Sequence, residues 1–290
     1  MKIKWSWVDS TAKRDKAARD ILKAPVIGVD TEYDSFRYFR EKLCLLQINS
    51  GLCSYIFDPL ANLDISFLGE VFASSKTVKV IHAGDNDIRI LKRDYDFSFN
   101  QIFDTHCAAA LLGCRQLSLA ALIRQFLAVD FEKQKKLQRS RWENRPLTEE
   151  QLHYAAQDTV FLIDLYRKLH EELDHAGLLD AATDGFEGIA SVSWHEKIMN
   201  RQGYRHIQGF NSLTMEARER LKRLYLWRFN KGKNINRALF MIISDQELLQ
   251  ISRTGEPTLV SLITSAGLSQ DKVQRYGSEL LDILKGQPST

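Results

Sequence analysis

Three short acidic segments, set far apart in the chain, place the tightest constraint on how this sequence can fold. The first is Asp30-Thr31-Glu32, which follows an apolar, β-branched run over residues 24–29. Such a run predicts a buried strand, and because side chains in a strand alternate between faces, Asp30 and Glu32 point the same way. Two carboxylates held so close repel each other unless a cation intervenes. Standing alone, an Asp-x-Glu pair is more typical of a solvated strand end.

The second segment covers residues 82–87 and follows another predicted strand at 78–82. Apolar residues at helical spacing after it place Asp87 in the first turn of a helix. A carboxylate there also complements the helix dipole, so the position has a purely structural explanation. Asp85 is a competing candidate that could instead be the helix N-cap. We expect His82 to be a packed or hydrogen-bonded histidine rather than a metal ligand.

The third segment lies in a helix that is predicted to begin just after Thr148. Thr148 and Gln151 form a capping box, and Pro146 stands just upstream. Tyr154 and Asp158 are four residues apart, so they are neighbours on one face of this helix. Asp has a poor helix propensity in such a position, which suggests a functional reason for it. Taken by itself, the pair is more typical of two surface residues.

Together, the order, spacing and context of the three segments resemble the DEDD-type 3′→5′ exonucleases of the Tyr-containing subclass, most closely the ribonuclease D family. The resemblance covers roughly residues 24–172 and selects Asp87 over Asp85. Further segments that match the family's sequence motifs lie at residues 43–48, 103–105 and 140–147. One departure is Arg141, which stands where the family commonly has Asp, and this places the role of its loop in doubt.

The resemblance implies a site with two divalent metal ions, Mg²⁺ or Mn²⁺. These hard cations prefer carboxylate and water oxygens, and two of them about 3.5–4 Å apart can stabilise the attacking and leaving oxygens of an in-line displacement. By resemblance, Asp30 bridges both ions, Glu32 and Asp158 hold the ion on the nucleophile side, and Asp87 supports the other. Tyr154 orients the attacking water. The implied activity is removal of nucleoside 5′-monophosphates from an RNA 3′ end, with tRNA precursors and other stable RNAs as substrates.

Several residues are candidates for contact with the nucleic acid. A basic stretch surrounds Trp142 just before the third segment, where a phosphate backbone could pass. The alternative for this stretch is a solvated loop. The candidate substrate contacts are Tyr33, Gln47, His82, Lys133, Arg139, Trp142 and Arg145.

A second domain is predicted at the C-terminal end. Residues 200–290 hold 14 Lys and Arg against 8 Asp and Glu, a balance that suits contact with a polyanion. The pattern from residue 212 to 287 resembles an HRDC domain, a small helical bundle, in which Trp227 is expected to be a core residue. The predicted organisation is an exonuclease domain at 1–175, a connecting region at 176–211 and the helical domain at 212–290.

The fold class is therefore α/β, with a ribonuclease-H-like mixed sheet followed by an all-α bundle. Strands are predicted at 26–31, 43–49, 52–57 and 78–82, with a helix at 63–73 and a mostly helical remainder. No apolar run approaches the roughly 18 residues of a membrane span. The first residues lack the apolar core of a signal peptide, and the four cysteines have no zinc-like spacing. We expect a cytoplasmic protein with free thiols and no membrane partner.

Two other functions remain open at this stage. A DNA exonuclease would use the same metal chemistry, and nothing in the sequence shows where an RNA 2′-hydroxyl would be read. A catalytically inactive RNA-binding protein is disfavoured because all four carboxylates and the tyrosine are present.

Overall fold

The computed structural model describes residues 3–130, 135–255 and 257–286 and divides the chain into two compact units. The first unit comprises residues 1–34 and 42–195, and the second comprises residues 35–41 and 196–290. The strands of the first unit are β1 (Trp5–Val8), β2 (Val26–Asp34), β3 (Lys42–Asn49), β4 (Ser54–Phe57), β5 (Val78–Ile81) and β6 (Ile102–Asp104). Its helices are α1 (Thr11–Ile21), α2 (Phe67–Ala73), α3 (Asp85–Tyr95), α4 (Thr105–Leu111), α5 (Leu119–Leu127), α6 (Lys135–Gln138), α7 (Glu149–Val160), α8 (Leu162–His175) and α9 (Leu179–Ser191).

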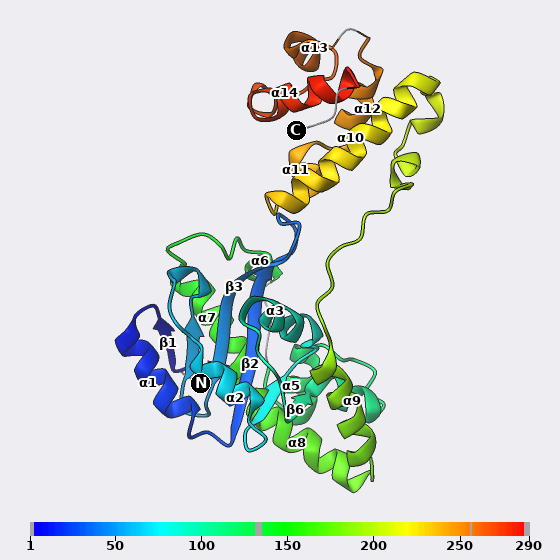
Figure 1. Cartoon of the computed structure of the whole chain (residues 1–290). Coiled ribbons are helices and arrows are strands. Elements are labelled where there is room, and N and C mark those ends of the chain that lie inside the picture. Colours follow the sequence, from blue (N-terminus) through cyan, green and yellow to red (C-terminus); the bar gives the residue numbers. More distant parts are fainter. Residues whose placement is uncertain (1–2, 131–134, 256, 287–290) are drawn as a thin grey trace. The chain divides into compact units, whose positions relative to one another are not determined.

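The first unit is built on a mixed sheet in the order β1-β4-β3-β2-β5-β6 (Figure 1). The strands β2, β3 and β4 pair antiparallel, while β1, β5 and β6 join parallel to their neighbours. The predicted mixed α/β fold is confirmed, although the sequence patterns missed the two outermost strands. Both are short, with four residues in β1 and three in β6, so they carry too little alternation to be recognised. Helix α2 also begins later than expected, at Phe67.

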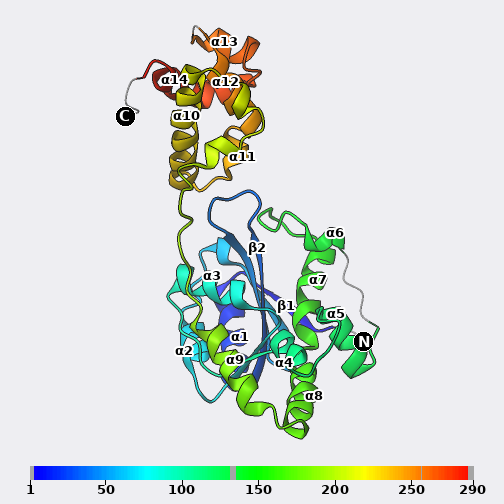
Figure 2. The same cartoon turned by 90° about the vertical axis from the view of Figure 1, so that its right-hand side faces the viewer.

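Helices cover both faces of the sheet (Figure 2). Helix α7 packs on β2, β3 and β4, and α8 continues along β2 and β5. The helix face turned to the sheet includes Ala155 and Ala156, both fully buried with Leu45 and Ile56 of the sheet. Because alanine is small, this face brings the backbone of α7 close to the strands.

A glycine on β2 permits an equally close approach at the junction of α7 and α8. A Cβ atom placed on Gly28 would lie 2.9 Å from the carbonyl oxygen of Thr159 and 3.1 Å from Cβ of Leu162. Nearby, the hydroxyls of Ser54 and Thr159 lie 3.1 Å apart, which ties α7 to β4. The position of α7 is therefore set by close contacts with the sheet.

The second unit is a helical bundle with its own apolar core. Its helices are α10 (Met215–Asn234), α11 (Leu239–Ile242), α12 (Asp245–Arg253), α13 (Leu259–Thr264) and α14 (Gln270–Leu284). Trp227 is buried in this core, as predicted, with its ring 5.9 Å from that of Tyr276 and its indole N–H donating to Glu279. No helix in the described ranges has the length and apolar character needed to cross a membrane.

The β2–β3 loop belongs to this second unit. Its Phe39 is buried against Phe229, with ring centroids 5.1 Å apart. Arg40 donates to both carboxylate oxygens of Glu196 and to the carbonyl of Lys233. The backbone adds a hydrogen bond from Ala238 N–H to the Arg37 carbonyl. The loop thus belongs to the second unit although it is far in sequence from the helices of that unit.

Candidate active site

The first acidic pair lies on β2, in the middle of the sheet. Asp30 and Glu32 are partly buried, and the strand register places Gln47 opposite Asp30 and Leu45 opposite Glu32. Directly opposed residues in an antiparallel pair share a face of the sheet. Leu45 packs in one cluster with Tyr154 and Ala155 of α7, so this face is the one that α7 covers.

Helix α7 brings the third segment to the same place. Its start is defined by the predicted capping box, in which Thr148 and Gln151 exchange hydrogen bonds. Both Tyr154 and Asp158 are buried on the side of the helix that packs on the sheet.

The charges that act on the pKa of Tyr154 indicate that Asp30, Glu32 and Asp158 lie near its hydroxyl. Burial raises the pKa of the Tyr154 hydroxyl, and the negative charge of Asp158 raises it further. The charges of Glu32 and Asp30 act on the pKa of Tyr154 in the same direction. Because such effects require proximity, the structure brings together four of the five predicted catalytic groups. The tyrosine keeps its proton at neutral pH.

The fifth group, Asp87, is buried in the first turn of α3 and accepts a hydrogen bond from the Thr31 hydroxyl. Thr31 lies between the two acidic residues of β2, so this bond ties Asp87 to the same segment of the strand. Burial raises the pKa of Asp87 to about 6, although the Thr31 hydrogen bond acts against the rise. The competing Asp85 is half-exposed and paired with Arg89 within α3.

One residue that organises the second segment was not singled out from the sequence. Asp104 is buried, and its carboxylate accepts hydrogen bonds from the backbone N–H groups of Ala83, Gly84, His106 and Cys107, at 2.8–3.2 Å. It thereby holds both the turn that leads into α3 and the start of α4. The sequence signal for this residue is the family-matching motif Phe-Asp-Thr at 103–105.

The histidine of the second segment is held by the residue next to Asp104. Nδ1 of His82 lies 2.9 Å from the hydroxyl of Thr105, which donates in turn to the Ile81 carbonyl. The ring of His82 also packs edge-on against that of His106.

The chemistry of the predicted ligands suits a hard cation, although their side chains are not arranged around a common metal-binding point. Across the described residues, no group of three or more acidic, histidine or cysteine side chains is placed to hold a metal ion. The four predicted ligands are nevertheless all carboxylates, which suit Mg²⁺ and Mn²⁺. Opposite Asp30, both polar atoms of the Gln47 amide are buried without a hydrogen-bond partner in the described part of the chain. A cation-bound water would satisfy such an amide.

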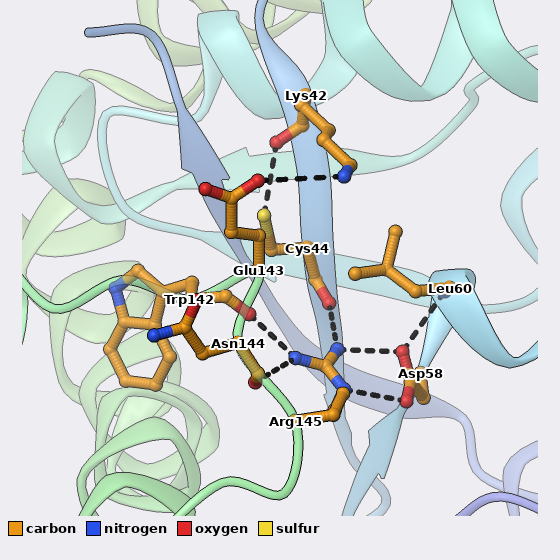
Figure 3. A network of polar contacts seen from close by, with 8 residues as sticks. All are labelled: Lys42, Cys44, Asp58, Leu60, Trp142, Glu143, Asn144 and Arg145. Carbon is orange, nitrogen blue, oxygen red and sulfur yellow. Dashed lines mark hydrogen bonds and ion pairs between the residues drawn. The ribbon is translucent and has the colours of Figure 1, made fainter. Parts of the chain in front are cut away.

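The candidate substrate contacts differ in how much surface they offer. Tyr33 is partly buried, Arg139 is exposed, and Lys133 lies outside the described residues. Trp142 is buried, and Arg145 is engaged in the polar network shown in Figure 3. These last two side chains are committed to contacts within the chain.

Two family patterns match the sequence. A family described as 3′-5′ exonuclease matches residues 5–174, and the HRDC domain matches residues 217–284. Ribonuclease D of Desulfotalea psychrophila is 27% identical over 275 residues, which cover 94% of this chain and 73% of that protein. An exosome complex component 10 homolog of Drosophila melanogaster is 30% identical over 254 residues, covering 85% of this chain. The match spans only 28% of that longer relative.

Solved structures show the same architecture. The catalytic core of RRP6 from Trypanosoma brucei superposes with a TM-score of 0.87 at 22% identity, covering 98% of this chain and 80% of that one. Escherichia coli RNase D superposes with a TM-score of 0.71 at 25% identity, covering 98% of this chain and 75% of that one.

Proposed function

Because the chain belongs to the 3′-5′ exonuclease family and carries an HRDC domain, we propose that it hydrolyses RNA stepwise from the 3′ end and releases nucleoside 5′-monophosphates. The resemblance to the ribonuclease D family, found in the sequence, is confirmed by several ribonuclease D relatives. The observation that carries the proposal is that the buried Tyr154 and Asp158 of α7 lie over the face of the sheet to which Asp30 and Glu32 belong.

In the proposed site, four carboxylates hold two divalent cations, Mg²⁺ or Mn²⁺. The ligands are Asp30, Glu32, Asp87 and Asp158. When bound, such ions stabilise the attacking and leaving oxygens of an in-line displacement. Tyr154 lies one helical turn before Asp158 on the same face of α7. In the proposed site, its hydroxyl orients the attacking water through a hydrogen bond.

The proposed substrate is a structured RNA with an accessible 3′ end, such as a tRNA precursor. The Escherichia coli relative is described as an exoribonuclease involved in structured RNA processing. In this chain, the excess of Lys and Arg over residues 200–290 suits contact with the phosphate backbone. The exposed Arg139 is a further candidate for a phosphate contact, and Tyr33 for a contact with the terminal base.

The reaction can be tested on RNA and DNA of matched sequence, labelled at the 5′ end and given Mg²⁺, Mn²⁺ or a chelator. We expect a metal-dependent ladder that shortens one nucleotide at a time and is faster on RNA. Equal or faster shortening of DNA would favour the DNA exonuclease of the same superfamily, and no shortening of either would reject the activity.

Two variants in the first turn of α3 test the assignment of Asp87 as a metal ligand. Asp87→Asn should abolish the ladder because it removes a buried carboxylate ligand. Asp85→Asn should keep the rate within about twofold, because it changes only a half-exposed ion pair with Arg89. Thermal unfolding checks that both variants fold. Full activity of Asp87→Asn in this assay would overturn the assignment.

A further inference from the structure

The guanidinium of Arg145 is the centre of a polar network that the proposed reaction does not use (Figure 3). Its Nε and Nη2 donate to the two carboxylate oxygens of Asp58, at 2.8 and 2.6 Å. The remaining N–H groups donate to three backbone carbonyls, namely Trp142 at 2.6 Å, Asn144 at 2.9 Å and Cys44 at 3.0 Å. An arginine has five N–H donors, so all of them are satisfied within the chain. None is left for a phosphate.

These contacts connect the α6–α7 loop to three strands. Asp58 directly follows β4, Cys44 lies in β3, and the guanidinium carbon lies 5.5 Å from the ring centroid of Trp7 in β1. The Asp58 side chain is 7% exposed and that of Arg145 is 25% exposed, so water screens the pair weakly. A bidentate pair of this kind fixes geometry as well as adding energy. The contacts of Arg145 therefore hold the α6–α7 loop in place against the sheet.

The α6–α7 loop carries the side chain that packs on the proposed water-orienting tyrosine. Trp142 is 2% exposed, and its ring centroid lies 5.9 Å from that of Tyr154, with the planes inclined by 32°. Its indole N–H lies 3.4 Å from the carbonyl of Gln138. The carbonyl of the same Trp142 is one of the acceptors of Arg145. A continuous chain of contacts thus runs from Asp58 through Arg145 and Trp142 to Tyr154.

We infer that Arg145, held by Asp58, is a positioning residue that keeps Trp142 against Tyr154 and so fixes the tyrosine in the orientation that the reaction needs. The inference rests on the proposed function of Tyr154. Its physical basis is that a displacement of about 1 Å at a reacting group can cost about 100-fold in rate. The same inference replaces the expectation that Arg145 and Trp142 contact RNA directly.

The test compares Arg145→Lys and Asp58→Asn with Glu143→Gln in the full chain. Lysine keeps the charge but loses the planar fork, and asparagine keeps the shape of Asp58 but loses its charge. Glu143 lies in the same loop and forms an ion pair with Lys42 at 3.6 Å, and its carboxylate accepts none of the five Arg145 hydrogen bonds. We expect kcat on a short RNA to fall about 10-fold or more in the first two variants, with KM within about twofold and no change in the control.

A double-mutant cycle tests whether Arg145 affects the reaction rate through Tyr154. In a Tyr154→Phe background, Arg145→Lys should cost little further rate, because residues that act as a unit are not additive. Additive losses with a raised KM and a weaker salt dependence of RNA binding would overturn the inference and make Arg145 a phosphate contact. Losses that follow thermal stability alone, and vanish when the assay is cooled, would also overturn it.

A spectroscopic measurement separates this inference from the proposed function. The near-UV circular dichroism of Trp142, isolated by subtracting the spectrum of Trp142→Phe, should change in Arg145→Lys and Asp58→Asn and persist in Glu143→Gln. This result requires no nuclease activity. An unchanged Trp142 signal in both network variants would reject the positioning role even in an active enzyme, whereas an inactive wild type with the expected spectra would reject only the proposed reaction.

Discussion

At the scale of single residues, Gln47 stands out because its buried amide lacks hydrogen-bond partners within the described residues. It is fully buried, and neither of its polar atoms has a partner within the described residues. An unsatisfied buried polar group costs about 1–3 kcal/mol. Gln47 lies opposite Asp30, so this cost is located at the proposed metal site. Active sites often retain such destabilising groups because function requires them.

We therefore predict opposite effects of Gln47→Met on stability and activity. Methionine has a similar shape without the polar amide, so unfolding in urea without metal should require about 1 kcal/mol more free energy. The hydrolysis rate in Mg²⁺ should fall about 10-fold or more. Gln125→Met, on an exposed helix position, is the control and should change neither quantity. A variant that loses stability would show that the Gln47 amide is already satisfied in the folded protein.

Strand periodicity pairs Asp30 with Glu32, and helix periodicity pairs Tyr154 with Asp158. The resemblance to the ribonuclease D family, and not periodicity, joins these two pairs into one predicted site. The role of Arg145 could not be predicted, because its partners come from β3, β4 and a loop. Which polar groups become buried depends on tertiary packing, and a basic loop gives no local sign of it.

At the scale of the elements, the geometry of the proposed active site depends on how closely α7 and α8 approach β2. Gly28 allows the approach, since a Cβ there would lie 2.9 Å from the Thr159 carbonyl oxygen. We predict that Gly28→Ala displaces the α7–α8 junction, costs about 1–3 kcal/mol of unfolding free energy and lowers kcat. Gly188→Ala in α9 is the matched control, because no atom lies within 4 Å of its added Cβ. The control should gain about 0.5–1 kcal/mol of stability and keep full activity.

Urea unfolding and steady-state kinetics measure both quantities in the two glycine variants. Equal stability and activity of Gly28→Ala and the parent chain would mean that the junction has room for a methyl group. The sequence identified Gly28 only as part of a buried strand run. Its contact partner lies more than 100 residues away, so no local pattern could have indicated the close approach.

At the scale of the whole molecule, residues 35–41 connect the strand that carries Asp30 and Glu32 with the helical unit. The sequence placed the helical domain at 212–290, but the second unit also includes this loop. Phe39 is 3% exposed there, and Arg40 is bound to Glu196. The loop contains no pattern that predicts packing on helices almost 200 residues away. A truncation designed from the sequence alone would therefore uncover apolar surface.

We predict that deleting residues 196–290 produces a chain that binds a hydrophobic dye and self-associates, because Phe39 loses its cover. The same truncation with Phe39→Ser should stay monomeric and still shorten a single-stranded RNA in Mg²⁺. Its binding to structured RNA should be weaker, with a smaller dependence on salt, because the basic unit is gone. Light scattering, dye fluorescence and filter binding at two salt concentrations measure these effects. If the truncation with Phe39→Ser binds structured RNA as the full chain does, the helical unit has no role in RNA binding. If the truncation that keeps Phe39 stays monomeric and binds no dye, the packing of Phe39 against the helical unit is contradicted.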